Sequence, residues 1–221
     1  TAMLLSGERL TKIYGTRVLL DGVSFYVDRG DKVGVIGING TGKSTLLRLL
    51  AGVEEPDEGT VRPDPNVRLE YLPQNPVFPG ERTVLEQVLA GLSDDDKVLA
   101  EYEAKTILNK LGVPRFDQKV GELSGGERRR VALAAVLARP CDVLLLDEPT
   151  NHLDDRMVGW LEDYLRSWKG ALVMVTHDRY FLERIVTKMV EVEGGRLYTC
   201  EGNYDKYLER KAARLESEKA S

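Results

Sequence analysis

The segment from Gly37 to Ser44 constrains this chain more than any other stretch of its sequence. It reads Gly-Ile-Asn-Gly-Thr-Gly-Lys-Ser, and a glycine, four residues and then Gly-Lys-Ser is the pattern of a loop that wraps around phosphate groups. Residues 32–36 form a short apolar run that suits a buried strand, and residues 45–51 suit a helix. The alternative is a chance glycine-rich turn. The complete pattern between a strand and a helix favours a phosphate-binding loop in an α/β fold.

The residue types of this loop match the chemistry of a bound nucleoside triphosphate. Glycine lets the backbone curl until successive N–H groups point inward at phosphate oxygens. We expect Lys43 to contact the β- and γ-phosphates and the Ser44 hydroxyl to bind Mg²⁺. The other predicted contacts from this segment are Gly37, Asn39, Gly40, Thr41, Gly42 and Thr45.

Length and composition are those of an ordinary globular protein. The chain has 221 residues, 42% hydrophobic and 30% charged, enough to bury a sizeable core. Its net charge of −5 argues against a strong nucleic-acid binder, because neutralising phosphates requires a basic face. With no apolar run near the ~18 residues of a membrane helix and no signal-peptide pattern, we expect no membrane insertion. Cys141 and Cys200 match no metal spacing and suggest reduced thiols in a cytoplasmic protein.

Residues ahead of the loop predict an antiparallel layer. Residues 10–14 and 19–28 read as strands, and the second alternates apolar and more polar side chains. Tyr14 lies at the turn between them. An aromatic ring upstream of a phosphate loop can stack on adenine, and a packed or half-exposed surface tyrosine is the alternative.

Gln74 is a further candidate ligand. It follows a short strand predicted over residues 68–72. A glutamine just beyond a strand end can reach a Mg²⁺-bound water, whereas most glutamines in exposed loops are simply solvated.

A small helical lobe is predicted downstream of Gln74. Thr83 and Glu86 have the spacing of a capping box, which predicts the start of a helix. We expect an acidic break at residues 93–96 and then an amphipathic helix over residues 97–111.

The segment Leu123-Ser124-Gly125-Gly126-Glu127 precedes a strong helical pattern over residues 127–138. Ser124 can cap that helix. A helix N-terminus flanked by glycines is a second anion site, whereas the alternative for Ser-Gly-Gly is a flexible linker. The three arginines at 128–130 are expected to be mostly solvated on the outer face of the helix.

Carboxylates and a histidine follow two predicted buried strands. Residues 143–146 are uniformly apolar, as in a central parallel strand, and end in Asp147 and Glu148. Because α/β sheets place ligands at the carboxyl ends of their strands, we expect Asp147 to hold Mg²⁺ and Glu148 to orient or activate water. His177 follows the apolar run 171–176 and can reach the γ-phosphate. The alternatives are a strand end that caps the next element and a structural or solvated histidine.

The C-terminal part predicts a β-hairpin and a charged helix. Residues 187–193 and 196–200 flank Gly194-Gly195 as the two strands of a hairpin. The helix expected from Asp205 onward has mixed charge and few core anchors, so we expect it to project from the domain.

Together these segments resemble the ATP-binding cassette (ABC) ATPase domain, in the family's order and over nearly the whole chain. The resemblance is carried by Tyr14, Gly37–Ser44, Gln74, Leu123–Glu127, Asp147-Glu148, the loop ending at Asp154, and His177. It implies a P-loop NTPase fold with a RecA-like parallel core, an antiparallel β subdomain and an α-helical subdomain at about residues 83–138. Residues 1–202 would form the nucleotide-binding domain. ATP and Mg²⁺ would be its ligands, and two cassettes would pair head to tail for hydrolysis. Ser124, Gly125 and Gly126 would then complete the nucleotide site of the opposite cassette.

Within that family the chain resembles the ABC-F class, in its Uup-like branch. Residues 147–154 read Asp-Glu-Pro-Thr-Asn-His-Leu-Asp, and Gly-Asn-Tyr-Asp-Lys-Tyr-Leu at 202–208 precedes the charged helix. The resemblance implies the first cassette of a two-cassette cytoplasmic protein acting on the ribosome, with residues 203–221 beginning the linker. The alternative is the ATP-hydrolysing subunit of an ABC membrane transporter. The stretch between Gln74 and Ser124 is shorter than in the class, which predicts missing residues near 94–96 or a member without an insertion.

Overall fold

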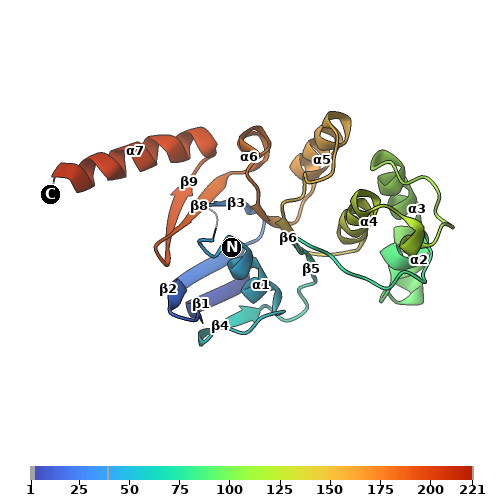
Figure 1. The fold of residues 1–221 in the computed structure, drawn as a ribbon, viewed down its shortest axis with the longest axis horizontal. Helices are drawn as coiled ribbons and strands as arrows, with labels where there is room; N and C mark the ends of the chain where they lie inside the picture. The colour runs from blue at the N-terminus through green and yellow to red at the C-terminus, as the bar shows by residue number, and fades with distance from the viewer. Residues whose placement is uncertain (1–2, 39, 221) are drawn as a thin grey trace.

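The computed structural model describes residues 3–38 and 40–220, and Figure 1 shows their two sheets and the helices around them. The strands are β1 (Met3–Tyr14), β2 (Arg17–Asp28), β3 (Lys32–Ile36), β4 (Glu58–Pro63), β5 (Leu69–Leu72), β6 (Val143–Asp147), β7 (Ala171–Val175), β8 (Lys188–Glu193) and β9 (Arg196–Glu201). The helices are α1 (Lys43–Ala51), α2 (Val84–Leu89), α3 (Asp94–Lys110), α4 (Gly125–Ala138), α5 (Asp155–Ser167), α6 (Arg179–Ile185) and α7 (Tyr204–Ala220), with a 3-10 turn, η1 (Val120–Glu122). Asn39, a predicted nucleotide contact, lies outside the described residues. No described helix combines the length and the apolar composition needed to cross a membrane.

The larger sheet confirms the predicted parallel core. Its strand order is β5-β6-β7-β3-β8-β9, and the first five strands run parallel to one another. β9 is antiparallel to β8, which confirms the predicted hairpin. Because β3, β5, β6 and β7 run in the same direction, their carboxyl ends lie at one edge of the sheet.

The predicted antiparallel layer is the smaller sheet, β2-β1-β4. β1 begins at Met3, well before the predicted residue 10. Its register shifts between Gly7 and Leu10, and Arg9 has a positive φ of 51°. Such a bulge interrupts the alternation of side chains, so period-2 reasoning misses the first half of the strand.

Successive residues of the central strands pack on opposite faces of the parallel sheet. On β6, Leu144 and Leu146 join the core beneath α4, α5 and α6, while Val143 and Leu145 join the core shared with α1 and the antiparallel sheet. In Figure 1, α5 and α6 lie above the parallel strands and α1 lies below them. Both faces are therefore covered, which explains the uniformly apolar sequence of β6.

The helical lobe differs from expectation at residues 93–96. We predicted an acidic break there, and this was wrong. The Ser93 hydroxyl accepts a hydrogen bond at 3.1 Å from the N–H of Asp96, so α3 begins at Asp94 and runs continuously to Lys110. Three aspartates in a first turn are favourable because the N-terminus of a helix carries partial positive charge.

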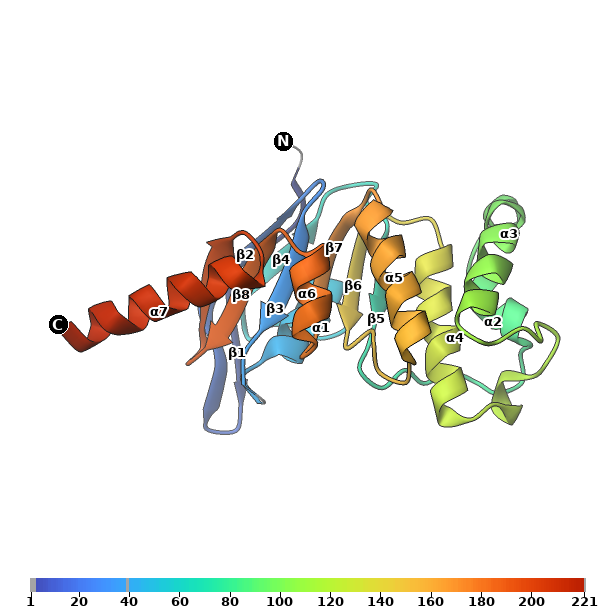
Figure 2. The same cartoon turned by 90° about the horizontal axis from the view of Figure 1, so that it is seen from above.

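The first half of α7 is anchored to the hairpin by one buried residue and a cluster of charged hydrogen bonds, which fits the expectation of few core anchors. Tyr207 is buried, and its hydroxyl donates to Glu191 on β8 at 2.8 Å. Lys211 and Arg214 donate to the same carboxylate at 2.7 and 2.8 Å. Beyond this cluster α7 extends away from the sheets, as predicted (Figures 1 and 2).

Glu191→Gln is expected to remove an acid-sensitive part of the chain's stability. Burial alone would raise the pKa of Glu191, but hydrogen bonds from Lys211, Arg214 and Tyr207 outweigh it and lower the pKa below its ordinary 4.5. A lowered carboxyl pKa stabilises the fold above the ordinary value, and this contribution is lost as pH falls through the folded-state pKa. Urea unfolding should therefore show a large loss of stability in the variant at about pH 7 and a much smaller one below about pH 4. Glu201→Gln, at a mostly exposed position on β9, is the control. An equal loss at both pH values would contradict the prediction.

Candidate active site

A cleft of about 520 Å³ lies where the carboxyl ends of the parallel strands meet the N-terminus of α1. It brings together residues that are far apart in the sequence. The predicted residues that line it are Tyr14, Gly40, Gly42, Lys43, Ser44, Thr45, Gln74, Asp147, Glu148 and His177.

The phosphate loop has a backbone that depends on glycine. Gly37 has φ of +154°, and a Cβ there would lie 2.6 Å from the carbonyl oxygen of Val192. Gly42 has φ of +100°, in the left-handed region that other residues rarely adopt. Lys43 Nζ donates to the Gly37 carbonyl at 2.6 Å, and Thr41 Oγ1 donates to the Ile38 carbonyl at 2.7 Å. The loop thus curls back on itself, and the bond from Lys43 to Gly37 joins its two ends.

The N-terminus of α1 supplies hydrogen-bond donors to the same cleft. Gly42 is its N-cap, and no side chain caps the helix. The Leu46 N–H already donates to the Gly42 carbonyl at 2.9 Å, so the N–H groups of residues 43–45 precede the first intrahelical bond. Uncapped N–H groups and the helix dipole together favour a phosphate group at this position.

Asp147 ends β6 with its carboxylate buried, at 1% exposure. Neither carboxylate oxygen has a hydrogen-bond partner of normal geometry among the described residues. Burial raises the pKa of Asp147, and the Ser44 hydroxyl and the charges of Arg129, Arg48 and Lys43 oppose that rise. A buried carboxylate with free oxygens, close to a hydroxyl, fits a hard cation such as Mg²⁺.

This donor set suits Mg²⁺ bound together with a phosphate ligand. The described residues contain no group of three or more His, Cys, Asp or Glu able to hold a metal alone. Mg²⁺ typically uses one or two carboxylates, waters and substrate phosphates rather than an all-protein cage. Ser44, Gln74 and Asp147, which all line the cleft, would supply such a partial set.

Glu148 and His177 form a pair at the edge of the cleft. Glu148 has a positive φ of 51°, and its N–H donates to the Val175 carbonyl at 2.7 Å. Its Oε1 lies 3.3 Å from His177 Nε2. Burial raises the pKa of Glu148, and the neighbouring His177 opposes that rise. A buried carboxylate with a raised pKa beside a phosphate site is suited to accept a proton or orient a water.

Tyr14 lines the cleft with its ring half exposed. Its hydroxyl donates to the carboxylate of Glu54, which also accepts from Arg48 at 3.0 Å. Fixing the hydroxyl limits the orientation of the ring. The structure places Tyr14 where an adenine contact is possible, and stacking itself stays a prediction.

Three lining residues were missed from the sequence: Arg17, Leu19 and Val175. Arg17 and Leu19 are two residues apart on β2 and so share a face. Arg17 lies against the phosphate loop, since a Cβ on Gly40 would be 3.2 Å from its Nη2. The position of Arg17, a basic residue just after the turn at Tyr14, was the sequence feature that could have identified it as a residue of the cleft.

The predicted anion site at Ser124, Gly125 and Gly126 does not join this cleft. Ser124 caps α4 as expected, accepting from the Glu127 N–H at 3.1 Å and donating its own N–H to Glu127 Oε1 at 3.0 Å. Gly125 and Gly126 line a separate hollow of about 480 Å³, together with residues 74–78 and His152.

The expectation that the three arginines of α4 are mostly solvated was wrong for Arg129. Arg128 is exposed, whereas Arg129 is 6% exposed. Arg130 Nε donates to the Leu111 carbonyl at 2.8 Å. The helical period places Arg129 on the inner face, where its guanidinium meets backbone carbonyls instead of water.

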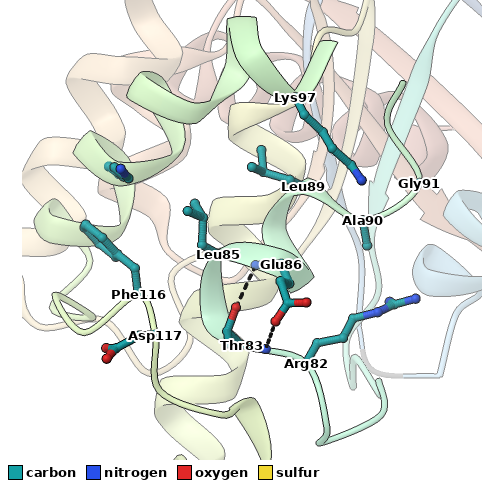
Figure 3. Close-up of a pocket in the computed structure, with 11 residues that line it drawn as sticks. Arg82, Thr83, Leu85, Glu86, Leu89, Ala90, Gly91, Lys97, Phe116 and Asp117 are labelled. Carbon is teal, nitrogen blue, oxygen red and sulfur yellow. Dashed lines mark hydrogen bonds between the residues drawn. The ribbon is translucent and has the colours of Figure 1, made fainter. Parts of the chain in front are cut away.

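A slightly larger hollow, about 550 Å³, lies in the helical lobe away from these residues (Figure 3). Leu85, Leu89 and Phe116 contribute its apolar lining. The polar groups of Thr83 and Glu86 in Figure 3 are bonded to each other's backbone in the capping box that starts α2. Volume alone therefore does not identify the site, because this hollow includes neither the phosphate loop nor the carboxylates that follow β6.

Comparison with known proteins gives consistent matches. A family model described as ABC transporter matches residues 20–151. The uncharacterized ABC transporter ATP-binding protein YfmR of Bacillus subtilis is 42% identical over 96% of this chain and 39% of its own length. The energy-dependent translational throttle protein EttA of Haemophilus influenzae is 40% identical over 93% of this chain and 44% of its own. A crystal structure of archaeal ribosome recycling factor aABCE1 with ribosomal stalk protein aP1 matches with a TM-score of 0.78 and 30% identity, covering 96% of this chain and 42% of that one.

The chain thus spans less than half the length of these relatives. The alignments with YfmR and EttA extend over 248 and 243 positions, more than the 221 residues of this chain. Each relative therefore carries residues that have no counterpart here. With a matched family model over more than half its length and the parallel core that holds its phosphate loop, the chain belongs to the ABC transporter family, as an ABC ATPase domain.

Proposed function

We propose that this chain binds Mg²⁺–ATP and hydrolyses ATP as one of two cooperating cassettes. The observation that supports this most is the single cleft that gathers the phosphate loop, Asp147, Glu148 and His177. Residues 1–202 would be the nucleotide-binding domain, with residues 83–138 its helical subdomain. Residues 203–221 would begin a linker helix.

Each group has a role that its position supports. The loop N–H groups and Lys43 bind the phosphates, with Thr41 and Gly37 shaping the loop and Tyr14 contacting the base. Mg²⁺, held by Ser44, Gln74 and Asp147, would offset negative charge on the phosphates. Glu148 orients the attacking water and accepts its proton, and His177 steadies the γ-phosphate.

A second cassette is proposed because the cleft does not include the phosphate contacts predicted at the start of α4. Gly125 and Gly126 lie at the start of α4 and line a different hollow, and Ser124 is the N-cap of the same helix. In a head-to-tail pair they would meet the γ-phosphate held by the opposite cassette. The chain alone would then be monomeric, bind ATP and hydrolyse it weakly.

The cellular role we propose is that of the ABC-F class, in translation on the ribosome in the cytoplasm. EttA is named as a translational throttle and aABCE1 as a ribosome recycling factor. Residues 147–154 and 202–208 carry the sequence that resembles the ABC-F class.

Sedimentation with ribosomes tests this role. The natural protein, with any second cassette that it carries, would be centrifuged through a sucrose cushion with ribosomes and either ADP or a non-hydrolysable ATP analogue. We expect the analogue to increase the ribosome-bound fraction by about tenfold, because closure of two cassettes on ATP creates the binding-competent form. Equal, low binding with both nucleotides, together with recovery in the membrane fraction of cells, would favour the transporter alternative.

A further inference from the structure

Arg129 connects three elements that surround the proposed active site. From α4, its Nη1 donates to the carbonyls of Pro73, at 3.2 Å, and Gln74. Its Nη2 donates to the carbonyls of Asp147 and Glu148, each at 2.8 Å. One guanidinium thus bonds four carbonyl oxygens on two segments.

These bonds lie just beyond the point where the hydrogen-bonded pairing of β5 and β6 ends. β5 and β6 are paired up to Leu72 and Leu146. The next residues on each side, 73–74 and 147–148, have left the β5–β6 ladder and carry the proposed Mg²⁺ and catalytic groups. Arg129 bridges them directly beyond the last pair. A planar guanidinium with donors on two nitrogens suits this geometry, whereas a lysine ammonium does not.

The same contact supports the unusual backbone of Glu148. A positive φ is unfavourable for a residue with a side chain and persists where surrounding bonds impose it. The Glu148 N–H is fixed by the Val175 carbonyl, and its own carbonyl accepts from Arg129 and from the Asn151 N–H at 3.2 Å. Arg129 therefore helps to set the direction in which the Glu148 carboxylate points.

We propose that Arg129 is a positioning residue that holds the Gln74 loop and the Asp147-Glu148 segment in the arrangement needed for Mg²⁺ and hydrolysis. This role rests on the proposed ATPase function. Because Arg129 lies about one and a half turns after Ser124, the N-cap of α4, it also ties the start of that helix to the reacting groups. Movement of α4, such as docking of a second cassette would cause, is thereby transmitted to Gln74 and Glu148.

The test compares Arg129→Gln and Arg129→Lys with Arg128→Gln, which removes an exposed arginine from the same helix. Hydrogen–deuterium exchange is measured on nucleotide-free protein in peptides covering residues 148–153, where the amides of residues 148, 151 and 153 are hydrogen bonded. We expect exchange there to be about tenfold faster in both Arg129 variants and unchanged in Arg128→Gln. Exchange in β7 should be unchanged in all three, which distinguishes local release from general unfolding.

A second measurement connects this role to Mg²⁺. ATP affinity is measured by calorimetry with Mg²⁺ and with EDTA. We expect Arg129→Gln to lose most of the Mg²⁺-dependent gain in affinity while the affinity in EDTA stays within about threefold, because Lys43 and the loop are untouched. Arg129→Lys should also lose the Mg²⁺-dependent gain, since the planar guanidinium geometry is required and a positive charge alone is not sufficient.

The outcomes separate this proposal from the function on which it rests. Exchange at residues 148–153 that matches Arg128→Gln would overturn the role of Arg129, whether or not ATP is hydrolysed. If Arg129→Gln does not fold, Arg129→Lys decides the same comparison, and full recovery of exchange and Mg²⁺ dependence by lysine would also overturn it. Failure of the unaltered chain to bind ATP would instead refute the proposed function and leave the exchange result standing.

Discussion

Replacing Glu148 with Gln is expected to slow ATP hydrolysis by about 100-fold or more while ATP affinity stays within about threefold of the unaltered chain. Glutamine has nearly the same shape as glutamate, so it can occupy the space beside His177 that the carboxylate now occupies, 3.3 Å away. It cannot accept a proton from the attacking water. Phosphate release under single-turnover conditions and calorimetric titration with Mg²⁺–ATP measure the two quantities separately.

Pairing gives this variant a second expected property. If hydrolysis separates two cassettes, Glu148→Gln should accumulate the paired form in ATP, visible as a larger species in analytical ultracentrifugation. Glu58→Gln is the matched control, because Glu58 is an exposed carboxylate on β4. Hydrolysis by Glu148→Gln at the unaltered rate would show that Glu148 is not the general base.

The residues that could be predicted are those whose chemistry is local in the sequence. The loop at 37–44 has a fixed spacing, and β6 ends in carboxylates after an uninterrupted apolar run. The carboxyl ends of parallel strands meet at one edge of a sheet, so Gln74, Asp147 and His177 could be assigned to the same region before any coordinates.

The residues that escaped prediction act through contacts distant in sequence. Arg129 is one of three consecutive arginines, and the helical period can place it on the inner face of α4 without naming the carbonyls of residues 73 and 147 that its guanidinium reaches. Glu191 looks like an ordinary strand carboxylate until α7 folds back over it. Helical period gives the face of a side chain, but the partner on that face depends on tertiary packing.

Replacing Lys43 with Met is expected to weaken Mg²⁺–ATP binding by more than about 100-fold, with a smaller loss for ADP. Lys43 is almost buried, and burial lowers its pKa while Glu148 and Asp147 oppose that effect. Its ammonium now donates to the Gly37 carbonyl, and the same group would exchange that bond for charge-assisted bonds to the β- and γ-phosphates. Methionine keeps the length and apolar stem of lysine, so the loop should keep its shape without the charge.

The difference between the two nucleotides distinguishes phosphate contact from a general effect on the loop. If Lys43 bonds both the β- and γ-phosphates, ATP loses two charge-assisted bonds and ADP loses one, each worth roughly 1.5–3 kcal/mol. Calorimetry with Mg²⁺–ATP and Mg²⁺–ADP measures both losses, and Lys219→Met, at an exposed position near the end of α7, is the control. Equal losses for ATP and ADP would place the ammonium on the β-phosphate alone. Unchanged affinity for both would mean that phosphate binding depends on the N–H groups of the loop and α1, with Lys43 serving only to close the loop onto Gly37.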